Sequence, residues 1–123
     1  GGAIDGPAAD KAARFIQLCD AFDIPLLFLC DTPGFMVVPE IEKTALVRHS
    51  SRMFLTGANL SVPFFTIVLR KAYGLGAIAM AGGSYKTPFF TVRSFSIFNN
   101  LLNIVILQTY ILKPVLILYI WNF

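Results

Sequence analysis

Ionisable side chains are few and unevenly placed in this sequence of 123 residues. It has one histidine, two cysteines and seven acidic residues, and all seven acidic residues fall between Asp5 and Glu42. A hydrolytic triad needs a histidine within reach of a nucleophile. The single histidine, His49, falls inside a helical stretch, and no candidate nucleophile lies at a spacing that would indicate a catalytic pair. We therefore expect His49 to be structural, and we exclude an enzyme built on a histidine-activated nucleophile.

The two cysteines, Cys19 and Cys30, are too few for a disulfide framework and belong to no CxxC or Cys/His ligand spacing. We expect two buried thiols, no metal site and a reducing compartment. No charged leader with an apolar core opens the sequence, so the expected location is the cytoplasm, or the mitochondrial matrix in a eukaryote.

The net charge of +3 would favour a nucleic-acid partner only if the basic residues were clustered. They are not, because Arg48 and Arg52 lie one helical turn apart and Arg70–Lys71 is a lone pair. The excess of positive charge reflects the lack of acidic residues in the second half, and we expect no nucleic-acid partner.

Hydrophobic spacing and turn residues predict alternating helices and strands in the first three quarters of the chain. Asp5, Gly6 and Pro7 offer a helix start, and Gly57 offers a helix stop. The expected elements are a helix after residue 6, a strand at 26–30, a turn at 31–34, a helix at 39–56, a strand at 64–69, a turn at 73–76 and a short helix ending near 82–83. Alternating helices and buried strands predict a parallel sheet.

The glycine-rich turn at residues 70–77 is the strongest candidate for chemistry. Glycines there leave backbone N–H groups bare at the start of a helix, where they can stabilise an oxygen that gains negative charge during a reaction. Removing one such donor typically costs about 3 kcal/mol of transition-state stabilisation. The alternative is structural, namely that Gly74 and Gly76 only permit tight packing of the helix on the sheet.

Two other functions are weaker alternatives. The sequence from Asp31 to Gly34 has the D-x-x-G form with which GTPases position magnesium and the terminal phosphate, but no G-x-x-x-x-G-K-[ST] or Asn-Lys-x-Asp accompanies it. Ser84 follows two glycines, but it lacks the Gly-x-Ser-x-Gly elbow and a base. We expect Ser84 to be a serine at a helix end.

Three motifs follow one another in the order and spacing found in carboxyltransferase subunits of biotin-dependent acyl-CoA carboxylases. They are Gly1 to Asp5 with Asp10-Lys11-Ala12-Ala13-Arg14-Phe15, then Asp31-Thr32-Pro33-Gly34-Phe35, then Arg70-Lys71-Ala72-Tyr73-Gly74. Over residues 1–92 the chain resembles the C-terminal crotonase-like domain of such a subunit, of the propionyl-, acetyl- or methylcrotonyl-CoA carboxylase type.

The resemblance implies transfer of a carboxyl group from carboxybiotin, held on a partner carrier domain, to the α-carbon of an acyl-CoA. It implies a site shared between two crotonase-like domains, each with an oxyanion hole, and assigns the biotin carbonyl to this half. The donors would be the backbone amides of Leu75 and Gly76. The other expected pocket residues are Asp31, Thr32, Pro33, Gly34, Phe35, Tyr73, Gly74 and Ala77, and the loop 31–35 would be a wall of the pocket rather than a base.

The same resemblance implies three partners besides acyl-CoA. They are the biotin carboxyl carrier domain, the N-terminal half of the carboxyltransferase and further copies in a homo-oligomer. The sequence departs from the family pattern at Val38, where a glycine is usual. Because a β-branched residue tolerates positive φ poorly, we expect a distorted loop there.

A larger departure begins at Arg93. Residues 94–112 carry no charged side chain, so one interpretation is a membrane anchor. Several Ser, Asn and Gln residues make the stretch polar for that role, and Pro114 interrupts its continuation. We favour a tail without function, produced by a frameshift, a retained intron or a wrong gene end, over membrane contact.

The predicted fold is α/β, a partial crotonase-like ββα superhelix in residues 1–92, followed by a hydrophobic helical tail outside the family in residues 93–123. The predicted function is that of a fragment of an acyl-CoA carboxylase carboxyltransferase, inactive in isolation. The alternatives are an inactive truncated gene product and a membrane-tethered binding module.

Overall fold

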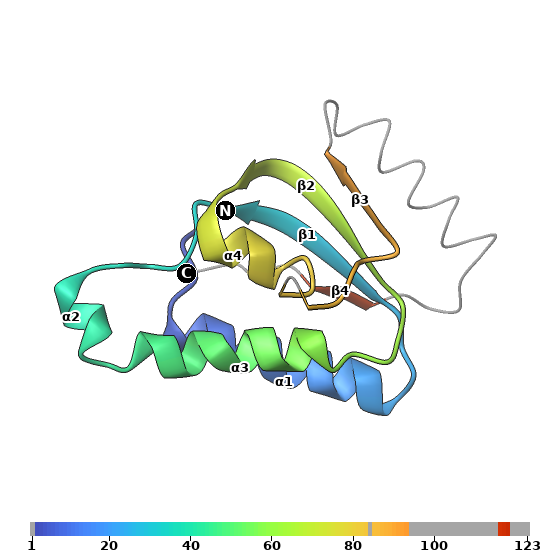
Figure 1. Ribbon diagram of the computed structural model, residues 1–123, viewed down its shortest axis with the longest axis horizontal. Coiled ribbons are helices and arrows are strands. Elements are labelled where there is room, and N and C mark those ends of the chain that lie inside the picture. Colours follow the sequence, from blue (N-terminus) through green and yellow to red (C-terminus); the bar gives the residue numbers. More distant parts are fainter. Residues whose placement is uncertain (1, 84, 94–115, 119–123) are drawn as a thin grey trace.

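The computed structural model describes residues 2–83, 85–93 and 116–118. Its centre is a parallel sheet in which β1 (Leu26–Thr32) lies beside β2 (Phe64–Ala72). The sheet continues with β3 (Phe90–Arg93) next to β2 and β4 (Leu116–Leu118) next to β1, giving the order β3-β2-β1-β4 (Figure 1). All three pairings are parallel. The predicted parallel α/β arrangement is confirmed, and the two outer strands are additions to it.

Beyond Arg93, which ends β3, the tail contributes only β4 to the described structure. Residues 116–118 form a strand rather than the predicted helix. The rest of the predicted helical tail, residues 94–115 and 119–123, lies outside the described residues. Among the helices that the structure describes, none is both long enough and apolar enough to cross a membrane.

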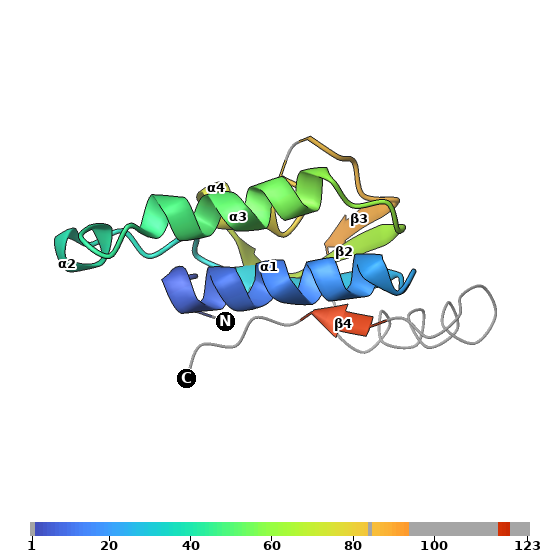
Figure 2. The same ribbon diagram turned by 90° about the horizontal axis from the view of Figure 1, so that it is seen from below.

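Two long helices, α1 (Gly6–Ala21) and α3 (Leu46–Ala58), pack side by side beneath one face of the sheet (Figure 2). α1 begins as the sequence predicts, because the Asp5 carboxylate accepts a hydrogen bond from the Ala8 amide at 2.8 Å and Pro7 occupies the first turn. Its buried side is made of small side chains and Ile16, which lets the helix lie close to the sheet.

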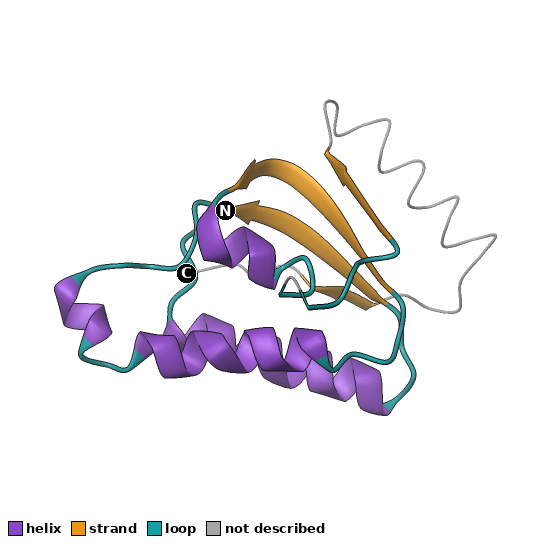
Figure 3. Ribbon diagram, in the orientation of Figure 1, coloured by secondary structure: helices purple, strands orange, loops and turns teal. Residues whose placement is uncertain are grey.

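The single helix predicted at residues 39–56 is wrong, because the structure has α2 (Pro39–Glu42) and α3 separated by a turn. Ala45 in that turn adopts a left-handed conformation with φ of 59°. No residue of α2 is buried, whereas α3 begins with the buried Leu46, so packing holds only α3 in place. Figure 3 shows α2 projecting from the body of the molecule. The distortion expected at Val38 is also wrong, because its φ of −140° is ordinary extended backbone.

The core lies on both faces of the central strands, as the unbroken apolar runs predict. On the helix-covered face, Phe28 and Phe64 meet edge to face with ring centroids 5.9 Å apart. On the other face, Leu27, Phe65 and Ile67 form a second buried cluster. Burying each of these large side chains contributes roughly 1.5–3 kcal/mol. Cys19 and Cys30 are buried free thiols, as predicted.

Two aspartates tie α1 to the next helix and loop. Asp10 contacts Nδ1 of His49 at 2.7 Å and the Arg52 guanidinium at 3.1 Å, so His49 has the structural role expected of it. One carboxylate oxygen of Asp20 accepts hydrogen bonds from the Ser61 amide and hydroxyl, both at 2.8 Å, and from the Val62 amide at 3.1 Å.

Candidate functional site

Two glycine loops meet at the carboxyl ends of β1 and β2. We name residues 31–35 the first glycine loop and residues 70–77 the second glycine loop. The strands are parallel, so their ends lie at one edge of the sheet, and Thr32 is paired with Ala72 in the register. The Tyr73 amide donates a hydrogen bond to the Thr32 carbonyl at 3.2 Å, which joins the loops directly. Two motifs far apart in the sequence therefore form one surface.

The loops touch through their glycines. A Cβ atom at Gly76 would lie 2.9 Å from both the Cα and the carbonyl carbon of Gly34, closer than real Cβ contacts. A Cβ at Gly34 would lie 3.3 Å from the Tyr73 carbonyl oxygen, and Gly34 has φ of +121°. Gly74 differs, because no atom lies within 4 Å of its hypothetical Cβ but its φ is +58°. Gly76 is thus required for space and Gly74 for backbone conformation.

Three backbone amides at the start of α4 (Gly74–Ala79) are bare. Within the described part of the chain the N–H groups of Gly74, Leu75 and Gly76 donate no hydrogen bond, whereas the Ala77 amide donates to the Tyr73 carbonyl at 3.4 Å. Gly76 is buried, and buried amides without an acceptor are uncommon in folded proteins. α4 has only six residues, so its individual amides, rather than a summed helix dipole, are suited to bind an oxygen.

Asp31 is held in an ion pair at the same edge. Arg70 approaches its carboxylate at 3.2 Å, and the Lys71 amide donates to it at 3.1 Å. Burial alone would raise the pKa of Asp31, but interactions that include the hydrogen bonds from Arg70 and Lys71 lower that pKa below its ordinary value. A carboxylate stabilised in this way is a poor proton acceptor, which agrees with a wall rather than a base.

The polar groups of the D-x-x-G sequence are engaged within the protein. The Gly34 amide donates to the Thr32 hydroxyl at 3.1 Å, and the Asp31 carboxylate is engaged by Arg70 and Lys71. In a GTPase the amide of this glycine would bind the phosphate and the carboxylate of this aspartate would bind magnesium. In this chain both groups form hydrogen bonds or ion pairs within the protein instead. Among the residues that the structure describes, no three His, Cys, Asp or Glu side chains gather to hold a metal ion. Ser84 lies outside the described residues.

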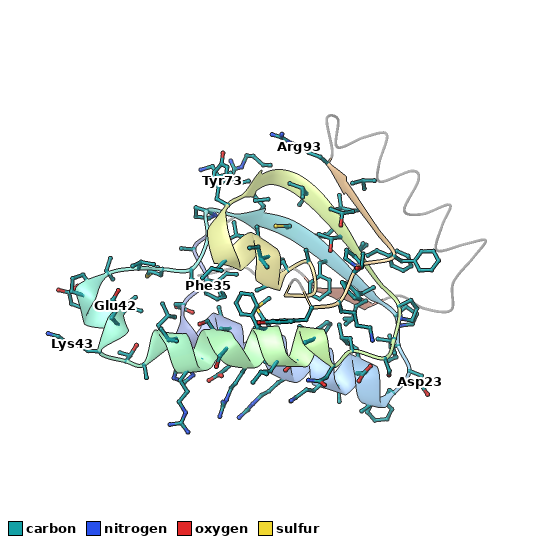
Figure 4. The ribbon with its side chains drawn as sticks, viewed as in Figure 1. Asp23, Phe35, Glu42, Lys43, Tyr73 and Arg93 are labelled. Atoms are coloured by element: carbon teal, nitrogen blue, oxygen red, sulfur yellow. The ribbon has the colours of Figure 1, made fainter. Side chains whose placement is uncertain are left out.

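The remaining predicted pocket residues point in different directions. Phe35 turns toward α3, where its ring centroid lies 6.0 Å from that of Phe54, while Tyr73 is 58% exposed on the other side of α4 (Figure 4). Pro33 is exposed, and Ala77 packs against the core. The structure therefore brings Gly34, Tyr73 and the bare amides together but directs the ring of Phe35 into the packing between loop and helix.

Sequence reasoning missed the support beneath the loops. The Ile4 amide donates to the Gly34 carbonyl at 2.9 Å, the Met36 amide donates to the Ile4 carbonyl at 2.9 Å, and Thr32 bonds to the same loop. The Gly34 amide donates to the Thr32 hydroxyl, which closes a turn that a Thr before Pro-Gly favours, so the sequence did contain a signal for this bond. The contribution of Ile4 had no local signal, because it depends on the tertiary fold, which brings the N-terminal segment next to the first glycine loop.

Comparisons with known proteins agree on one family. Residues 1–96 match the carboxyl transferase domain family. The biotin-dependent long chain acyl-coenzyme A carboxylase beta4 subunit of Mycobacterium tuberculosis is 49% identical over 86 residues, which are 70% of this chain and 16% of that subunit.

Solved structures give the same result. The geranyl-CoA carboxylase beta subunit of P. aeruginosa has a TM-score of 0.69 at 36% identity, covering 88% of this chain and 23% of its own. The transcarboxylase 12S subunit, whose structure is described as a hexamer assembly with methylmalonyl-coenzyme A bound, has a TM-score of 0.69 at 31% identity, covering 87% of this chain and 22% of its own.

The solved relatives are crotonase-like carboxyltransferases, which confirms the coarse fold expected from the motifs. This chain spans less than a quarter of the length of each relative named above. Its match to the family runs through both glycine loops and all of the bare amides. The chain therefore belongs to the carboxyl transferase domain family, as the order of its three motifs predicts.

Proposed function

We propose that this chain is a segment of an acyl-CoA carboxylase carboxyltransferase and that it provides the donors for the biotin carbonyl oxygen. The observation that carries the proposal is the pair of bare amides at Leu75 and Gly76, at a loop edge that matches the family. The names of its relatives support the reaction class, since the M. tuberculosis relative is described as biotin-dependent and as an acyl-CoA carboxylase subunit.

The residues present fit a ureido carbonyl. Its oxygen is an acceptor that needs N–H donors, and the start of α4 offers donors without an acceptor of their own. Bound carboxybiotin supplies the carboxyl group. The amides of Leu75 and Gly76 would stabilise the negative charge that develops on the ureido oxygen as that group leaves. The contact between Gly34 and Gly76 holds the Gly76 backbone in place beforehand.

The other residues of the edge shape the site. Asp31 is fixed by Arg70, so it forms a wall and leaves proton transfer to other groups. Tyr73 and Leu75 are 58% and 63% exposed and present apolar surface next to the amides. We propose that the ring system of biotin, carried by a partner domain, rests on this surface. The thioester carbonyl would be held by the N-terminal half of the carboxyltransferase. The complete enzyme would be a homo-oligomer, to which this chain contributes a partial ββα superhelix of the crotonase type.

A chimera tests the proposal. Residues 2–93 of this chain would replace the matching segment of the M. tuberculosis beta4 subunit, and the chimera would be assembled with the biotin-bearing subunit of that enzyme. We expect labelled carboxyl to be transferred from the biotin-bearing subunit to acyl-CoA at a measurable fraction of the rate of the parent. A chimera that folds and assembles like the parent but transfers no label would contradict the proposal.

A further inference from the structure

We propose that Thr32 is a positioning residue, which sets the place of the Leu75 and Gly76 amides by holding both glycine loops at once. This inference rests on the proposed function. Thr32 ends β1 and is 2% exposed. Only it and Thr66 are buried polar or charged side chains among the described residues.

The Thr32 side chain holds the first glycine loop. Its hydroxyl accepts a hydrogen bond from the Gly34 amide at 3.1 Å and lies 3.2 Å from the Gly34 carbonyl and 3.0 Å from the Gly2 carbonyl. One hydroxyl proton can be donated to only one of the two carbonyls at a time, while its lone pairs continue to accept from Gly34. Removal of the hydroxyl would leave the buried Gly34 amide without an acceptor, which favours a shift of the loop.

The Thr32 backbone holds the second glycine loop. Its carbonyl accepts from the Tyr73 amide at 3.2 Å, and Tyr73 is the residue immediately before α4. The residues that follow Tyr73 are those with the bare amides. One residue thus bonds the first loop through its side chain and the second loop through its main chain.

Packing connects these two bonds to the site. Gly76 rests on Gly34 so closely that a Cβ would meet the Gly34 backbone at 2.9 Å. A shift of Gly34 therefore moves the surface that supports the Gly76 amide. Misplacement of a reacting group by about 1 Å can lower a rate by about a hundredfold, so a smaller shift is enough for a measurable effect.

Thr66 provides a matched control on the neighbouring strand. It is 0% exposed, and its hydroxyl donates to the Met80 carbonyl at 3.0 Å, just beyond the C-terminal end of α4. Thr→Val at either position removes one buried hydroxyl and keeps the shape of the side chain. Only the change at Thr32 acts on the end of α4 that carries the bare amides.

The experiment compares Thr32→Val, Thr32→Ser and Thr66→Val in the active chimera described above. We expect Thr32→Val to lower kcat about tenfold, with KM for acyl-CoA within about twofold of the parent chimera. Thr32→Ser keeps the hydroxyl, and we expect its kcat to stay within about twofold. Thr66→Val should lower the melting temperature but leave kcat per folded molecule unchanged.

Amide hydrogen exchange in the complete 123-residue chain gives a readout that does not depend on activity. Thr32→Val should speed exchange at Gly34 and Tyr73, and Thr66→Val should not. Unchanged exchange at both amides would overturn the inference, and so would an equal loss of kcat in Thr32→Ser and Thr32→Val. If Thr32→Val does not fold, Thr32→Ser decides by itself, because a tenfold loss of kcat with the hydroxyl present would contradict the role given to it.

The two proposals fail differently. An inactive but assembled parent chimera would contradict the proposed function, and faster exchange at Gly34 and Tyr73 would then still support the coupling of the loops through Thr32. An active chimera with a fully active Thr32→Val variant would leave the proposed function standing and remove the positioning role.

Discussion

Glycines in this site meet two different physical demands. Gly76 is needed because the Gly34 backbone occupies the space of a side chain, and Gly74 is needed because its φ is +58° with open space around it. The sequence predicts a turn at 73–76, but the structure places both glycines in the first turn of α4, which ends at Ala79. The sequence could not distinguish the two demands, because the partner of Gly76 comes from another strand end and leaves no mark in the local pattern.

Substitution by alanine and asparagine should separate these demands. Asparagine tolerates left-handed backbone better than alanine does, so Gly74→Asn should destabilise the fold less than Gly74→Ala, which we expect to cost about 1–2 kcal/mol. At Gly76 the order should reverse, because the larger side chain meets the Gly34 backbone and overpacking costs about 1–3 kcal/mol or more. Urea unfolding of the four variants measures this, and the same order at both positions would show that space does not restrict Gly76.

Val38 shows the limit of reasoning from a family pattern. A glycine is usual there, but this chain adopts φ of −140° and accommodates valine in extended backbone without strain. A sequence pattern states which residue is common, and the local backbone decides whether another can replace it. By contrast, the turn predicted after the first strand is found where β1 ends, because the strand end and the following turn are both local features.

At the scale of elements, carboxylates attach α1 to its neighbours. Burial raises the pKa of both Asp10 and Asp20, but hydrogen bonds from His49 and Arg52 to Asp10, and from Ser61 and Val62 to Asp20, bring each pKa below its ordinary value. The unfolded chain therefore takes up protons first as the pH falls. The stability from these contacts is full above the ordinary carboxyl pKa of about 3.9 and is lost as the pH falls through the lower folded-state values.

Asp20→Asn tests this dependence. Asparagine keeps an oxygen that can accept from Ser61 and Val62 but does not titrate. We expect the variant to lose less stability than the parent chain between about pH 6 and about pH 3. Urea unfolding at both pH values measures the difference, with Asp23→Asn as the control at an aspartate in the same region. A parent chain that becomes more stable toward about pH 3 would contradict the assignment.

The break between α2 and α3 is also a matter of packing. The pattern of residues 39–56 supports a helix throughout, but helical spacing alone does not show which turns have a surface to pack against. No residue of α2 is buried, whereas Leu46, Met53 and Gly57 of α3 are. Local helix preference without tertiary contact is weak support for so short a segment.

Hydrogen exchange should therefore differ between these two helices. Amides of α2 should exchange near the rate of unstructured chain, because opening the helix exposes no buried side chain, while those of α3 and β1 should be protected. Measurement by mass spectrometry on peptides from residues 37–45 and 46–58 makes the comparison. Equal protection of both peptides would mean that α2 packs against something.

At the scale of the whole molecule, the chain corresponds to one part of its relatives. It spans less than a quarter of each relative named above. Its three motifs specified the family and the edge of the sheet where the loops meet, because motif order and strand topology survive in a short segment. The pairing of β3 and β4 with the central strands was not predicted, because register between distant segments depends on the complete sheet.

The exposed face beside the amides fits a site completed by other domains. Tyr73 and Leu75 are largely exposed next to donors that have no acceptor within the described structure. Exposed apolar side chains beside donors without an acceptor are expected of one domain that contributes half of a shared site. The proposed function therefore depends on whether the N–H groups, rather than nearby side chains, stabilise the charge that develops in the reaction.

Replacement of single backbone amides by esters tests that claim most directly. In the chimera, leucic acid at Leu75 or glycolic acid at Gly76 replaces one N–H by an ester oxygen and keeps the side chain, and lactic acid at Ala77 does the same to an N–H that donates to the Tyr73 carbonyl within the helix turn. We expect the esters at Leu75 and Gly76 each to lower kcat for carboxyl transfer by about 10²–10³, and the ester at Ala77 to lower it by less than about threefold. Equal and small effects at all three positions would contradict the account.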